Sequence, residues 1–188
     1  MTGMEETAVR GGGHWRLLGW GGAVALLALP FVAMQFTREV DWTLSDFVLF
    51  GAMLGVVGLG IEFLVRQSGQ LSYRVAAALA MVTAFLLVWM NLAVGIIGSE
   101  NNDANMMFAA VLATACGGSL IVHFKPRGMS NAMLATAAVQ LAVGIIALAM
   151  DLGTDGKAWP RDVIVLTGGY AGLWLLAAGL FGIAARRG

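Results

Sequence analysis

The stretch WMNLAVGIIGSENNDAN, from Trp89 to Asn105, decides the fold of this chain. It begins as an apolar segment and turns directly into the most polar stretch of the sequence. Its apolar part, NLAVGII from Asn91 to Ile97, recurs as QLAVGII from Gln140 to Ile146, 49 residues downstream. A near-identical apolar segment at two places in one chain indicates an architecture built from related helical elements.

The composition is that of a membrane protein. Hydrophobic residues make up 59% of the 188 residues and charged residues only 12%, whereas a soluble domain carries about 25% charged residues. The net charge is zero, so nothing points to nucleic acid as a partner. The single cysteine, Cys116, excludes a disulfide within the chain and disfavours a thiolate metal site. We expect no metal and no cofactor.

Six apolar spans follow a polar, glycine-rich tail at residues 1–16. Each span has about 18–25 residues, the length that a helix needs to cross a hydrocarbon core of about 30 Å. The apolar runs are continuous and do not alternate, which favours helices over barrel strands. We therefore predict one all-α transmembrane domain over residues 17–185, with helices at about 17–35, 44–65, 75–97, 105–122, 132–150 and 162–185.

The charged residues predict the orientation of these spans. Eight of the eleven basic residues fall in the tails and the even-numbered loops: Arg10, Arg16, Arg66, Arg74, Lys125, Arg127, Arg186 and Arg187. The positive-inside bias then places both termini in the cytoplasm. The opposite face carries eight acidic residues against Arg38, Lys157 and Arg161, a formal charge of about −5 that attracts cations.

The repeated segment aligns the third span with the fifth. The second, fourth and sixth spans are related in another way, because Asp46, Asn105 and Asp162 stand at their starts. We interpret the chain as three tandem helical hairpins, in which an Asp or Asn caps each returning helix. Chance similarity among segments rich in Ala, Leu, Val and Gly is the alternative.

A cluster of oxygen-bearing side chains follows the third span. Five of them, Glu100, Asn101, Asn102, Asp103 and Asn105, offer hard ligands that suit a divalent cation. Their spacing does not match an EF-hand loop, which needs a central Gly and a terminal Glu. The alternative is a solvated turn in which Asn105 or Asp103 caps the next helix.

Three polar residues are predicted inside the hydrocarbon. Asn91 and Gln140 occupy equivalent positions of the repeated segment, so they form either a solute site near the midplane or a hydrogen bond that joins two helices. Glu62 is the one acidic residue within an apolar span. Intramembrane acids are candidates for function, but Arg66, four residues further on, can pair with Glu62.

No recognisable catalytic or haem-binding pattern is present. His14 and His123 are the only histidines, and His14 falls in the polar tail, so they do not form a pair of axial haem ligands within a bundle. The sequence contains no HExxH motif, no Ser-His-Asp set and no glycine-rich phosphate loop. We therefore expect no enzymatic activity.

The segment WMNLAVGIIGSENNDANMMF, residues 89–108, resembles small polytopic inner-membrane proteins of bacteria that have no assigned function. The resemblance covers about 20 residues, and more loosely the hydropathy of the rest of the chain. It implies a helical protein of the bacterial inner membrane. It implies no activity, cofactor or catalytic residue.

Two functions follow as expectations. The first is an integral membrane protein of structural, assembly or accessory type, whose partners are the lipid bilayer and a second copy or another membrane protein. The alternative is a small oligomeric transporter or channel for a cation or small polar solute, in which Asn91, Gln140 and Glu62 line the route.

Overall fold

The structure, a computed structural model, describes residues 14–154, 156 and 158–187. This part of the chain forms six α-helices and one short 3-10 helix, without any strand. Six helical segments in it are long and apolar enough to cross a membrane, which confirms the all-helical class and the number of spans. Most of the predicted tail and two loop charges, Asp155 and Lys157, lie outside the described residues.

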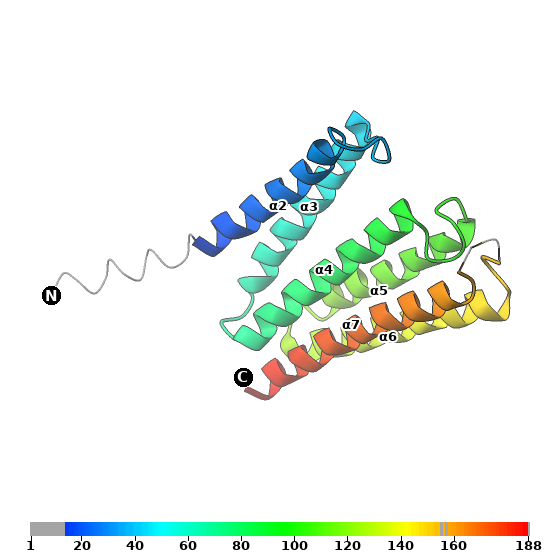
Figure 1. The fold of residues 1–188 in the computed structure, drawn as a ribbon. Coiled ribbons are helices and arrows are strands. Elements are labelled where there is room, and N and C mark those ends of the chain that lie inside the picture. Colours follow the sequence, from blue (N-terminus) through cyan, green and yellow to red (C-terminus); the bar gives the residue numbers. More distant parts are fainter. Residues whose placement is uncertain (1–13, 155, 157, 188) are drawn as a thin grey trace. The chain divides into compact units, whose positions relative to one another are not determined.

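The contacts of the chain divide it into two compact units, residues 1–60 and 61–188. The first unit is a hairpin of α2 (His14–Ala33) and most of α3 (Leu44–Val65) (Figure 1). Two glycines of α3 face α2: a Cβ on Gly58 would stand 3.0 Å from the ring of Trp20, and one on Gly51 would stand 3.6 Å from Leu27. These small residues let the two helices of the hairpin approach closely.

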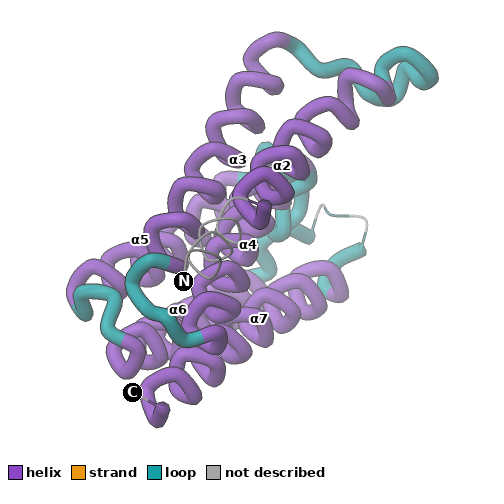
Figure 2. The backbone as a smooth tube through the Cα atoms, turned by 90° about the vertical axis from the view of Figure 1, so that its left-hand side faces the viewer, coloured by secondary structure: helices purple, strands orange, loops and turns teal. Residues whose placement is uncertain are grey.

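The second unit contains the last turn of α3 and four long or medium helices: α4 (Leu71–Ala93), α5 (Phe108–Ile121), α6 (Pro126–Ala149) and α7 (Arg161–Arg187). The 3-10 helix η1 (Asp103–Met107) leads directly into α5. Helix α7 packs against both α6 and α4, and α6 also packs against α5 (Figures 1 and 2). The packed helices run antiparallel, so their ends gather at two ends of the unit.

Large side chains fill the interior of this second unit. Trp174, Tyr73, Phe181 and Leu87 are almost completely buried, and the rings of Tyr73 and Phe181 lie 5.0 Å apart. Alanines at the same interfaces let the α4 and α7 backbones approach, as expected where lipid gives no hydrophobic drive for helices to associate. The outward-facing apolar side chains of the unit suit contact with lipid.

Several helix ends differ from the prediction. Helix α4 ends at Ala93, four residues before the predicted Ile97, because Gly95 adopts a left-handed backbone with φ of +79°. The amides of Val94 and Gly95 both donate to the carbonyl of Met90, which closes the last turn. Helix α6 begins at Pro126, six residues earlier than predicted, since proline is favoured at the first position of a helix.

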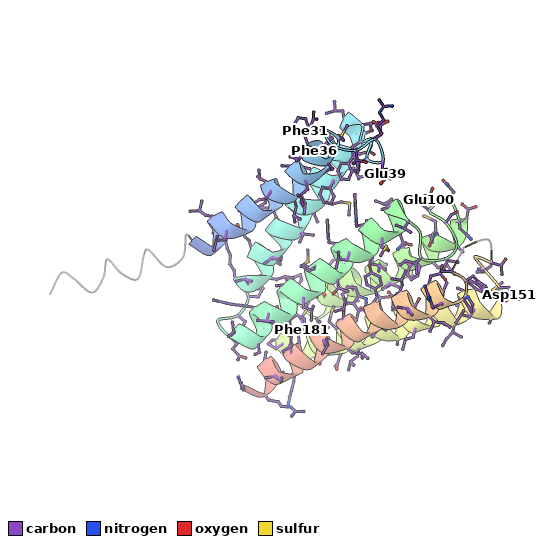
Figure 3. The ribbon with its side chains drawn as sticks, viewed as in Figure 1. Phe31, Phe36, Glu39, Glu100, Asp151 and Phe181 are labelled. Atoms are coloured by element: carbon purple, nitrogen blue, oxygen red, sulfur yellow. The ribbon has the colours of Figure 1, made fainter. Side chains whose placement is uncertain are left out.

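The two ends of the second unit differ in charge. One end holds the turns between α3 and α4 and between α5 and α6, together with the last turn of α7. Its basic residues among those described are Arg66, Arg74, Lys125, Arg127, Arg186 and Arg187. The other end holds Glu100, Asp103, Asp151 and Asp162 beside one described basic residue, Arg161, and Figure 3 shows Glu100 and Asp151 at this end.

Candidate functional site

Asn105 organises the loop that follows α4. Its side chain is buried, and its Oδ1 accepts hydrogen bonds from the amides of Ile96 and Ile97 at 3.0 and 2.9 Å. Its Nδ2 donates to the carbonyls of Ile97 and Ser99 at 3.3 and 2.7 Å. One carboxamide therefore replaces the backbone hydrogen bonds that these residues lose where α4 ends.

The loop after α4 also packs against the loop between α6 and α7. Gly153 has a φ of +90°, and a Cβ on it would stand 2.6 Å from the backbone nitrogen of Gly98. Only glycine fits such a conformation and such a backbone approach without strain. We call residues 94–102 and 150–154 the loop cap. Within the loop cap, Ile96 and Ile97 are almost completely buried, and so is Val163 in the first turn of α7.

The structure separates the predicted cluster of cation ligands into two groups. Asn105 is buried against the loop cap, and Asn102 caps η1 by accepting from the amide of Ala104 at 2.9 Å. The helix cap expected of Asn105 or Asp103 is therefore provided by Asn102. Glu100 and Asp103 are exposed, and no group of three or more His, Cys, Asp or Glu side chains that could hold a metal ion occurs among the described residues.

The aspartates predicted at the starts of returning helices do bind backbone amides. Asp46 Oδ2 accepts from both the amide and the hydroxyl of Thr43, each at 2.7 Å, at the start of α3. Asp162 Oδ1 accepts from the amide of Val163 at 2.8 Å, in the first turn of α7. These carboxylates stabilise helix starts, where amides lack partners within the helix.

Asn91 and Gln140 do not bond to each other, contrary to one of the two interpretations of the repeat. Asn91 Nδ2 donates to the carbonyl of Leu87 on its own helix at 2.7 Å, and its buried Oδ1 has no partner among the described residues. Gln140 is completely buried on α6, and in the described part of the chain neither of its amide atoms finds a partner. The two equivalent residues of the repeated segment therefore do not form a hydrogen-bonded pair.

Two polar groups of α7 are also buried and unpartnered within the described residues. The hydroxyl of Thr167 and the indole Nε1 of Trp174 are buried, and neither has a hydrogen-bond partner within the described ranges. We call Gln140, Thr167 and Trp174 the polar layer. A buried polar group without a partner costs about 1–3 kcal/mol, so three such side chains are expensive unless something satisfies them.

The register of α6 and α7 places Gln140 between Thr167 and Trp174 along the helix axis. A Cβ on Gly144 would stand 2.5 Å from Thr167 Cγ2, and Ser130 Oγ donates to the carbonyl of Ala178 at 2.9 Å. Gln140 precedes Gly144 by four residues, so its level on the antiparallel α7 lies between Thr167 and Trp174. At 1.5 Å per residue, the axial offsets are about 6 Å and about 5 Å.

Glu62 pairs with Arg66 as the spacing predicted. Arg66 Nη2 lies 3.6 Å from Glu62 Oε2, one helical turn apart, with the Arg66 side chain 71% exposed and that of Glu62 11% exposed. The contact is a local ion pair near the basic end of the second unit. It weakens the argument that Glu62 acts alone inside the membrane.

The sequence interpretation missed Thr167, Trp174 and Gly144. Single Thr and Trp residues in apolar helices are ordinary, and only the packing of α7 in the bundle shows that their polar atoms are buried. A weak signal was present for Gly144, because a glycine inside a helix favours close approach of a neighbouring helix.

Comparison with known proteins adds no assignment. No family model, no characterised protein and no solved structure matches this chain.

Proposed function

We propose that this chain is a non-enzymatic, multi-pass integral membrane protein of structural, assembly or accessory type, located in a bacterial inner membrane. The main support for the proposal is that polar side chains of the protein bind its own backbone. Asn105, Asn102, Asp46 and Asp162 all bind backbone groups of the chain itself. No charged residue is among the buried side chains of the described residues.

The proposed topology has six crossings, three tandem hairpins and both termini in the cytoplasm. It is supported by the difference between the two ends of the second unit, one basic and one acidic. Basic loops are retained on the cytoplasmic side during insertion. The acidic end, with the loop cap, would then face outward.

A partner within the membrane is part of this proposal. A Cβ added to Gly168, Gly172 or Gly179 of α7 would meet no other atom within 4 Å, so the surface of α7 has room beside these glycines. Glycines on one side of a membrane helix favour close packing with another helix. A second copy of this chain or another membrane protein would pack there.

The alternative is transport of a small polar solute, and one observation favours it. Gln140 presents two amide atoms without partners among the described residues, near the middle of a helix long enough to span a membrane. Solute sites of transporters often lie at this depth. The oxygen and nitrogen of the amide would then bind the solute.

Flux measurements on proteoliposomes distinguish these functions. The purified protein is reconstituted, and uptake of K⁺, Na⁺, urea and glycerol is compared with that of protein-free vesicles. A structural or accessory protein gives no added flux, and Asn91→Leu/Gln140→Leu changes only thermal stability. Saturable uptake that is lost in this double variant, while its helical content and melting temperature are retained, would replace the proposal with the transport alternative.

A further inference from the structure

Basic side chains gather at the end of the second unit that holds the α3–α4 and α5–α6 turns and the last turn of α7 (Figure 1). All of them are exposed, and we call them the basic rim: Arg66, Arg74, Lys125, Arg127, Arg186 and Arg187. The only acidic residue described at this end of the unit is Glu62, which pairs with Arg66. The rest of the rim therefore has no carboxylate partner among the described residues.

Helices α6 and α7 bring two arginines of the rim together. Ser130 Oγ donates to the carbonyl of Ala178 at 2.9 Å, and a Cβ on Gly182 would stand 3.5 Å from Ser130 Oγ. Arg127 lies three residues before Ser130, and Arg186 lies four residues after Gly182. Residues three or four apart share one face of a helix. Both arginines therefore lie one turn beyond this contact, on the facing sides of the two helices.

Tyr73 joins α4 and the α5–α6 turn at the same end of the unit. Its hydroxyl donates to the carbonyl of Phe124 at 2.8 Å, and its ring lies 5.0 Å from that of Phe181 on α7. Arg74 follows Tyr73 directly, and Lys125 follows Phe124. These two basic residues are thus each adjacent in the chain to a residue of this contact, so the packing of the helix ends holds their backbones in place.

The charge and the residue types of the basic rim fit a partner that bears phosphate. A surface with an excess of positive charge is complementary to a negatively charged partner. Five of the six rim residues are arginines. Arginine suits phosphate in particular, because its planar guanidinium can donate two parallel hydrogen bonds to one phosphate group.

Exposed apolar side chains lie one helical turn deeper than the rim. Ile183 precedes Arg187 by four residues on α7 and is 42% exposed. Ile121, the last residue of α5, precedes Lys125 by four residues and is 78% exposed. A phospholipid has the same order, with its phosphate outside and its acyl chains inside the membrane. The rim therefore matches a lipid better than it matches a phosphate free in solution, which would contact only the basic side chains.

We propose that the basic rim binds the headgroups of anionic phospholipids, whose acyl chains lie against the apolar side chains one turn deeper. Arg127 and Arg186 bind phosphate where α6 and α7 meet, and Arg74 and Lys125 bind it beside the contact of Tyr73 with Phe124. The proposal rests on the membrane-spanning architecture of the proposed function, but not on which side of the membrane the rim faces. It also goes beyond the positive-inside bias, which requires no bound lipid.

The test measures lipid bound to the purified full chain by native mass spectrometry. The probes are dioleoyl phosphatidylglycerol, dioleoyl phosphatidylcholine and inorganic phosphate. We expect phosphatidylglycerol to be retained at concentrations at which phosphatidylcholine is not, and to stay bound when phosphate is added. Arg127→Gln/Arg186→Gln should weaken its binding by about 30-fold, because each basic residue near an anionic lipid surface contributes about fivefold. Arg127→Lys/Arg186→Lys, which keeps both charges, should bind more tightly than the glutamine variant.

The matched control is Arg38→Gln/Arg161→Gln, which removes two exposed basic residues from the other predicted face of the membrane. Equal loss of binding in this control would overturn the proposal, as would equal retention of the two lipids or displacement of phosphatidylglycerol by phosphate. Unchanged binding in Arg127→Gln/Arg186→Gln would also overturn it. If this variant does not fold, Arg74→Gln/Lys125→Gln replaces it, with the same expected loss.

The flux measurement on proteoliposomes tests the proposed function separately. Saturable uptake by a protein that still retains phosphatidylglycerol would overturn the proposed function and leave the lipid site in place. Absence of flux together with equal retention of the two lipids would do the opposite.

Discussion

The side chain of Asn105 holds Ile97 by both of its backbone groups: Oδ1 accepts from the Ile97 amide at 2.9 Å, and Nδ2 donates to the Ile97 carbonyl at 3.3 Å. This pair fixes the path of the chain from the end of α4 into η1. A residue that the sequence marks as a candidate cation ligand is therefore the internal support of the loop cap. The remaining oxygen-bearing side chains of the cluster are left at the surface or at a helix start.

Replacing Asn105 by alanine is expected to destabilise the protein strongly. Asn105→Ala leaves the buried amides of Ile96 and Ile97 without an acceptor, and each such loss costs about 1–3 kcal/mol. We expect the melting temperature in detergent to fall by about 5–15 °C. Asn101→Ala is the control, because Asn101 is exposed and bonds to the adjacent Glu100. Equal melting temperatures for the two variants would contradict the supporting role of Asn105.

The contact between the two loops of the loop cap gives a second prediction. Gly153→Ala places a methyl group 2.6 Å from the nitrogen of Gly98, at a φ of +90°. The steric clash and the positive φ both destabilise the folded state, so the melting temperature should fall. Gly117→Ala, at a helical site of α5 with no atom within 4 Å, should leave it unchanged or raise it. The loop contact is refuted if Gly153→Ala is tolerated as well as Gly117→Ala.

The close approach of α6 and α7 gives a third prediction. Gly144→Ala forces its methyl group against Thr167 Cγ2, so we expect a lower melting temperature. Thr167→Ala removes that methyl group, and the double variant should recover part of the loss. The readout is the coupling energy from the four melting curves. Strict additivity of the two changes would show that these residues are not in contact.

The membrane architecture could be predicted from the sequence, because long apolar runs have only one stable form in lipid. The six spans are present, and Asp46 and Asp162 stand at helix starts as expected. The pairing of Glu62 with Arg66 also followed from their spacing of four residues. Each of these features depends on residues that are close in the chain.

The repeated segment shows where prediction from sequence reached its limit. LAVGII continues as helix in α6 at 141–146, but its other copy leaves the helix after Ala93. The residues that follow account for the difference: Ala147 and Leu148 extend α6, whereas Gly98 and Ser99 favour a loop. Asn105 then binds the freed backbone, a contact eight residues away in the chain. The polar layer was even harder to predict from the sequence, because it depends on how α6 and α7 pack against each other.

Cysteine labelling in whole cells tests the central claim, a membrane protein with its loop cap outside and its basic end inside. In a Cys116→Ala background, Asn101→Cys marks the exposed surface near the loop cap, and Gly69→Cys marks the turn between α3 and α4. A membrane-impermeant maleimide should label Asn101→Cys in cells with a permeabilised outer membrane, and label Gly69→Cys only after the inner membrane is disrupted. The reverse pattern would contradict the orientation, and labelling of both sites in intact inner membranes would contradict the spanning architecture itself.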